Sequence, residues 1–77
     1  MTSEADAAES LNQIKAAIGA QDLRRAVTLA EAALARGEEQ PLFLNLRAMR
    51  LEAEGRVSEA LADLERAREL APADFSI

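Results

Sequence analysis

The sequence predicts an all-α fold, and three observations lead to that prediction. The chain is rich in alanine, leucine, glutamate and arginine, which favour helices, and aromatic residues make up only 3% of it. Apolar residues recur with helical spacing in four successive segments. Short stretches with glycine, proline or aspartate separate these segments. We expect four helices, antiparallel in sequence order, in a single domain over residues 1–77.

The first predicted helix covers residues 4–19. Ser3 followed by Asp6 approximates a capping box at its start. Its apolar positions form one narrow stripe, made of Ala7, Leu11, Ile14, Ala17 and Ile18. A narrow stripe is typical of an outer helix that is covered on one side.

The second predicted helix covers residues 22–36, with Asp22 as its N-cap and Gly37 after its end. Its apolar positions are Leu23, Ala26, Val27, Leu29, Ala30, Ala33 and Leu34. These positions spread over two sides of the helix, so we expect it in the interior.

The third predicted helix covers residues 41–54, between Pro41 at its first position and Gly55 at its end. Its apolar residues are Leu42, Phe43, Leu44, Leu46, Ala48, Met49, Leu51 and Ala53. They are too many for one stripe, so this helix should be the most buried of the four.

The fourth predicted helix covers residues 57–70 and precedes Pro72. Its apolar residues are expected on one half-buried face, formed by Val57, Ala60, Leu61, Leu64 and Ala67. Asp63 and Arg68 stand where the equivalent positions of the second helix hold leucine, so we expect a polar outer side here. Such a side would let a short array end in water.

The two halves of the chain repeat with a period of about 34 residues. Identical pairs at that spacing are Ala26 with Ala60, Glu31 with Glu65 and Ala33 with Ala67. Together with Leu44, Ala48, Leu51, Gly55, Leu64 and Pro72, this pattern resembles the tetratricopeptide repeat. The first copy spans about residues 7–40, with Gln21 at the place of the turn glycine, and the second spans 41–74. The resemblance implies a four-helix α-solenoid fragment of two helix-turn-helix repeats.

Composition argues against several functions. The chain has no cysteine or histidine, which removes thiolate ligands, the commonest metal ligand and the commonest general base. Its net charge of −5 argues against nucleic acid, and no apolar run approaches a membrane span. The acid pairs Glu59/Asp63 and Glu65/Glu69 are interpreted as a solvated face rather than a catalytic dyad. We therefore expect no enzyme, cofactor or metal, and a cytoplasmic location.

The resemblance also implies a concave groove that is lined by the first helix of each repeat. The corresponding residues are Leu11, Lys15, Ile18, Leu42, Asn45, Met49 and Glu52. Asn45 would bond a peptide backbone and Met49 would supply an adaptable apolar contact. The competing interpretation is that Leu11, Ile18 and Leu42 belong to the core.

Two functions follow as hypotheses. The first is a protein-interaction module that binds a peptide, a partner helix or its own copy as a homodimer, with Phe43, Phe75 and Ile77 near the sticky surface. The alternative is the N-terminal helical arm of a larger bacterial enzyme. Alanine-rich repeats of this kind resemble those before aspartyl/asparaginyl β-hydroxylase-like and sulfotransferase domains. The expected polar side of the fourth helix favours the complete module.

Overall fold

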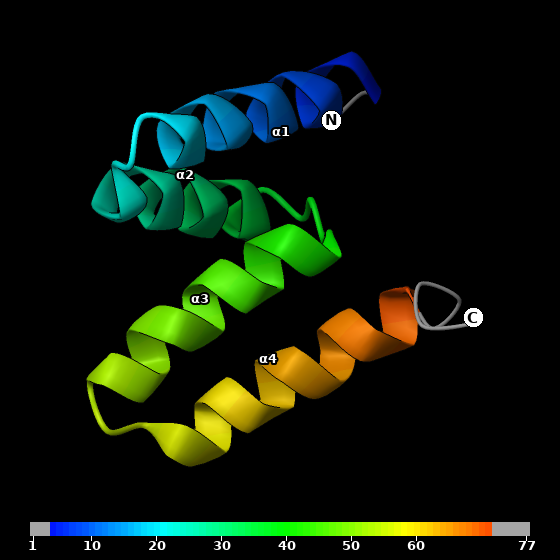
Figure 1. Cartoon of the computed structure of the whole chain (residues 1–77). Coiled ribbons are helices and arrows are strands. Elements are labelled where there is room, and N and C mark those ends of the chain that lie inside the picture. Colours follow the sequence, from blue (N-terminus) through cyan, green and yellow to red (C-terminus); the bar gives the residue numbers. More distant parts are fainter. Residues whose placement is uncertain (1–3, 72–77) are drawn as a thin grey trace, which may run out of the picture.

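Four α-helices make up the described part of the chain in the computed structural model, which describes residues 4–71, with side chains from residue 8 (Figure 1). The helices are α1 (Glu4–Gly19), α2 (Leu23–Ala35), α3 (Pro41–Ala53) and α4 (Val57–Leu70). No strand occurs among these residues, so the predicted all-α class is confirmed. The predictions for Ser3, for the side chains of Asp6 and Ala7, and for Pro72, Phe75 and Ile77 lie outside the described residues.

Each helix packs on the next one along the chain. Figure 1 shows α1 and α2 side by side, α3 starting against α2 and running away from it, and α4 returning along α3. The two interior helices therefore have neighbours on two sides. This arrangement agrees with the two helical hairpins expected from the sequence, and it explains why α2 and α3 need broad apolar surfaces.

The turns after α1 and α3 occupy equivalent places in the two repeats and have the same backbone geometry. Asp22 N–H donates to the Ala17 carbonyl at 2.9 Å, and Arg56 N–H donates to the Leu51 carbonyl at 2.8 Å. The residue before each donor is left-handed, with φ of 62° at Gln21 and 81° at Gly55. Such a helix ending favours glycine, so Gln21 carries a backbone cost that Gly55 avoids.

Small side chains form much of the core. The main cluster joins α1, α2 and the first half of α3, and consists of Ile14, Ala17, Ala26, Ala30, Ala33, Phe43 and Leu46. A second cluster joins α3 to α4 through Ala48, Leu51 and Ala60. The helix α3 has five buried residues, whereas α2 and α4 have three each, so α3 is the most buried of these three helices, as predicted. The alanines allow neighbouring helix axes to approach closely.

The predicted apolar face of α4 is confirmed at its alanines and wrong at its larger residues. Ala60 and Ala67 are buried as predicted, together with Asp63, whereas Val57, Leu61 and Leu64 are 51%, 54% and 42% exposed. The cause is that α3 lies against the alanine side of α4, which allows a closer approach than the leucine side. Leu64 therefore does not fill the space between the two helices.

The predicted polar outer side of α4 is also wrong. Asp63 is only 7% exposed and faces α3, where it pairs with Arg47. It therefore does not share a solvated face with Glu59, and the outer side carries the exposed apolar residues Leu61 and Leu64 instead.

Replacing Ala60 or Ala67 with leucine should lower the free energy of unfolding by about 1–3 kcal/mol, because added methylenes overpack a close helix crossing. Urea denaturation followed by circular dichroism measures the change. Ala62→Leu, on the exposed side of the same helix, is the control and should have an effect within about 0.5 kcal/mol. Equal stability of all three variants would show that this register of α4 is incorrect.

Gln21→Gly should raise the free energy of unfolding by about 0.5–1 kcal/mol, because glycine adopts the left-handed conformation without a side-chain clash. The reverse change, Gly55→Gln, should lower it by a similar amount. No atom lies within 4 Å of the Cβ position at Gly55, so this change tests the backbone alone. Thermal unfolding of both variants gives the comparison, and shifts of the same sign would contradict the shared turn geometry.

Candidate protein-binding site

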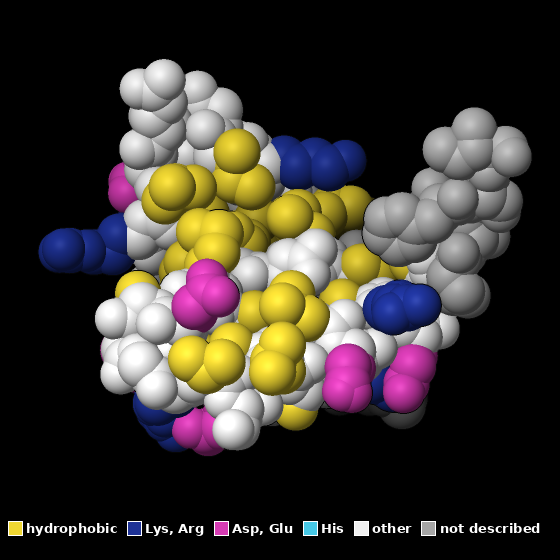
Figure 2. All heavy atoms as spheres, turned by 60° about the horizontal axis from the view of Figure 1, so that its bottom comes forward, with side chains coloured by type: hydrophobic (Ala, Val, Ile, Leu, Met, Phe, Trp, Pro, Cys, Tyr) yellow, Lys and Arg dark blue, Asp and Glu magenta, His cyan; other side chains and the backbone are white. Residues whose placement is uncertain are grey.

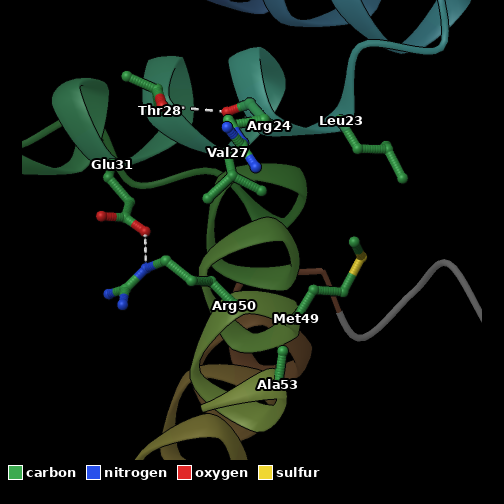
Figure 3. Close-up of a pocket in the computed structure, with 8 residues that line it drawn as sticks. All are labelled: Leu23, Arg24, Val27, Thr28, Glu31, Met49, Arg50 and Ala53. Atoms are coloured by element: carbon green, nitrogen blue, oxygen red, sulfur yellow. Dashed lines mark hydrogen bonds and ion pairs between the residues drawn. The ribbon is translucent and has the colours of Figure 1, made fainter.

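A pocket of about 490 Å³ opens between α2 and the second half of α3 (Figure 3). It forms because Phe43 and Leu46 hold the first half of α3 against the core, while the rest of α3 runs away from α2. The lining residues are Leu23, Arg24, Val27, Thr28, Glu31, Met49, Arg50 and Ala53. The angle between two helices thus leaves an open, wedge-shaped space.

Apolar side chains from both helices surround this space. Leu23 and Met49 are 49% and 46% exposed, and Val27 is half-buried at the edge of the core. In Figure 3, Leu23 of α2 and Met49 of α3 extend on the same side of the opening, with Ala53 below. Exposed apolar residues on two facing helices are typical of a surface that binds another apolar group.

Charged side chains close the opposite side of the pocket. Arg50 donates through Nε to Glu31 on α2, and through Nη1 to Glu54 at 2.7 Å. The hydrogen bonds to Glu31 and Glu54 raise the pKa of Arg50, and the bond from Arg50 lowers the pKa of Glu54. Arg50 and Glu54 are therefore both held in their ionised forms. The two hydrogen bonds of Arg50 keep its side chain turned away from the apolar side of the pocket.

The seven residues predicted for the groove differ in their surroundings. Met49 lines the pocket, whereas Leu11 and Leu42 are partly buried against the main core cluster, which favours the core interpretation for them. The other four predicted residues are exposed at the surface, namely Lys15, Ile18, Asn45 and Glu52. Phe43, expected near an exposed apolar surface that promotes self-association, is fully buried.

Sequence reasoning misses the contribution of α2 to the pocket, because helical spacing assigns Leu23 and Val27 to the interior stripe of their helix. The position of Leu23 is a signal that the sequence does contain, because this residue follows the N-cap Asp22 and so lies at the start of its helix. A neighbouring helix that crosses at an angle often leaves the end of a helix exposed. The crossing angle itself depends on side-chain packing and has no local signature.

A second pocket, of about 400 Å³, lies between α3 and α4 and is lined partly by Arg47, Arg50 and Arg56. Three arginines suggest an anion site, but each is already paired. The carboxylates that they meet are Asp63, Glu31, Glu54 and Glu59. Within residues 4–71 no group of three or more His, Cys, Asp or Glu side chains is arranged to hold a metal ion.

None of the described helices is both long and apolar enough to cross a membrane. Comparisons with protein-family models, with curated proteins and with solved structures find no match to this chain. The candidate site is therefore defined by its geometry, and of the two pockets described above the one between α2 and α3 has the more apolar lining.

The ion pair between Arg47 and Asp63 joins α3 to α4 in the lining of this second pocket. Two hydrogen bonds of 2.7 Å connect the guanidinium to the two carboxylate oxygens. The hydrogen bond to Asp63 raises the pKa of Arg47, so the guanidinium is held in its charged form. Asp63 is buried, so its carboxylate has little contact with water and depends on Arg47 for its hydrogen bonds.

Arg47→Ala should therefore lower the free energy of unfolding by about 1–2 kcal/mol, a value reduced because the Arg47 side chain is 37% exposed. Chemical denaturation is the measurement. Arg66→Ala, which removes exposed pairs with Glu39 and Glu69, is the control and should have a smaller effect, because water screens these pairs. A larger loss at Arg66 than at Arg47 would contradict the structural role of the Asp63 pair.

Proposed function

We propose that this chain is a protein-interaction module of the tetratricopeptide type, and that it binds its partner in the pocket between α2 and α3. The observation that carries the proposal is the exposure of Leu23 and Met49 on facing helices around an open space. The repeated turn geometry at Gln21 and Gly55 supports the family resemblance. A module of this kind works by surface complementarity and needs no catalytic group.

The chemistry of the pocket indicates what the partner presents. Leu23, Val27 and Met49 suit one or two apolar side chains, and the flexible thioether of Met49 adapts to different shapes. Arg24 lies at the border, and none of the described side chains forms an ion pair with it. An apolar peptide or helix with an acidic residue beside its anchor would therefore fit best.

A second copy of the chain is one such partner. Ile18 and Met49 are exposed, and a homodimer about a two-fold axis would bury these groups against their own counterparts. The acidic balance and the lack of cysteine support a cytoplasmic location for either kind of complex.

The alternative function, a helical arm before a catalytic domain of a larger bacterial enzyme, has one observation in its favour. The exposed residues Val57, Leu61 and Leu64 give α4 an apolar outer side, and a following repeat or domain would cover it. In that case the enzyme activity would belong to the other domain, and this chain would position it.

Peptides selected from a random library against the full chain should lose at least tenfold in affinity with Met49→Glu or Leu23→Glu, because a carboxylate would be buried at the contact. Fluorescence anisotropy measures the affinity, and sedimentation equilibrium over a hundredfold concentration range tests self-association of the same variants. Leu70→Glu, at an exposed leucine outside the pocket, is the control. Binders that are indifferent to Met49 and Leu23 would contradict the proposed site.

A further inference from the structure

The outer side of α4 carries a continuous apolar strip that no described element covers. Val57, Leu61 and Leu64 follow one another at spacings of four and three residues, so they lie on one side of the helix. All three are about half exposed. Figure 2, which turns the lower side of Figure 1 forward, shows hydrophobic side chains gathered over this face, with charged groups around them.

The first repeat shows what covers the equivalent strip. The equivalent residues there are Leu23, Val27 and Ala30 on α2. The helix α3 packs against this strip at Val27 and Ala30, while Leu23 stays half-exposed at the pocket. Ala30 is fully buried and Val27 is half-buried there. The same interface includes the ion pair between Glu31 and Arg50. The chain thus holds, in α2 and α3, an example of a helix docked on this strip.

The charges next to the strip on α4 match that example. Glu65 is the equivalent of Glu31 in the second repeat, is exposed, and has no ion pair with a described residue. The other carboxylates of α4 are Glu59, Asp63 and Glu69, and each forms an ion pair with an arginine of the chain. Glu65 is therefore placed to accept an arginine from outside, as Glu31 accepts Arg50.

We propose that the outer side of α4 is a docking surface for an amphipathic partner helix of the α3 type. The partner presents apolar residues at positions i, i+4 and i+7 and an arginine at i+8, as α3 does with Leu42, Leu46, Met49 and Arg50. The apolar residues cover Leu61 and Leu64, and the arginine pairs with Glu65. Arg68, exposed one turn beyond Leu64, attracts an acidic residue on the same partner.

A second copy of the chain gives a poorer match than a separate helix. Two α4 helices would pair antiparallel about a two-fold axis. The register that sets Leu61 of each copy opposite Leu64 of the other covers the strip. The same register places Glu65 opposite Ala60, which is buried on the inner side of α4, so no cation would meet the carboxylate.

The probe is a fluorescent peptide with the sequence of residues 40–56, in which the side that would meet α4 within the chain is made polar. The changes are Leu44→Glu, Ala48→Lys and Leu51→Gln, and the first two also form a helix-stabilising pair. Anisotropy is measured against the full chain. We expect saturable binding that Leu61→Glu weakens at least tenfold.

Leu70→Glu is the matched control, because Leu70 is an exposed leucine on the same helix, half a turn out of phase with Leu61. It should change the affinity less than twofold. Glu65→Arg should weaken binding about three- to tenfold, and the peptide change Arg50→Glu should restore it. Circular dichroism of each variant confirms that the fold is kept.

Three results would overturn the proposal. They are a lack of binding up to millimolar peptide, equal effects of Leu61→Glu and Leu70→Glu, and self-association of the chain that Leu61→Glu abolishes. The last would assign the surface to a second copy. The strip shares no residue with the pocket between α2 and α3, so Met49→Glu should leave this peptide bound, and the two sites can fail separately.

Discussion

The close approach of helices at alanine faces is the constraint on which the rest of this structure depends. Among residues 8–71, seven of the twelve buried apolar residues are alanines, and Ala26, Ala30 and Ala33 of α2 are fully buried. A methyl group lets two helix axes come nearer than a leucine does, and the close contact gains dispersion energy along the whole crossing. Because the helices contact one another through their alanine faces, larger apolar residues on the other faces remain exposed to solvent.

The same constraint produces both candidate binding surfaces. On α4, Ala60 and Ala67 turn toward α3, which leaves Leu61 and Leu64 at the surface about a quarter turn away. On α2, the alanines engage α1 and the first half of α3, and Leu23 lies beyond the reach of either. A core of small residues therefore leaves its leucines available, and burying them on a partner recovers free energy that folding alone does not gain.

Much of the fold could be predicted because helix ends have local signals. Pro41 and Gly55 bound α3, and Asp22 caps α2 through a hydrogen bond to Arg25 N–H, so the predicted limits agree with the structure to within one residue. The buried side of α4 could not be predicted. Its alanines and leucines form two apolar stripes side by side, and helical spacing alone does not show which one a neighbour covers. Of the residues that line the candidate pocket, the sequence register includes Met49 but not Leu23, because the pocket depends on a helix crossing angle.

Two ion pairs determine the orientation of α3, which the pattern of apolar residues alone does not specify. Arg47 reaches Asp63 on α4, and Arg50 reaches Glu31 on α2, so two arginines three residues apart fix the rotation of α3 between its neighbours. Neither pair is close in sequence, which is why Asp63 resembles a surface residue when the sequence is read alone. Rotating α3 about its axis would break both pairs and leave Asp63 buried without its cation. The ion pairs thus hold α3 in the orientation that presents Met49 to the pocket.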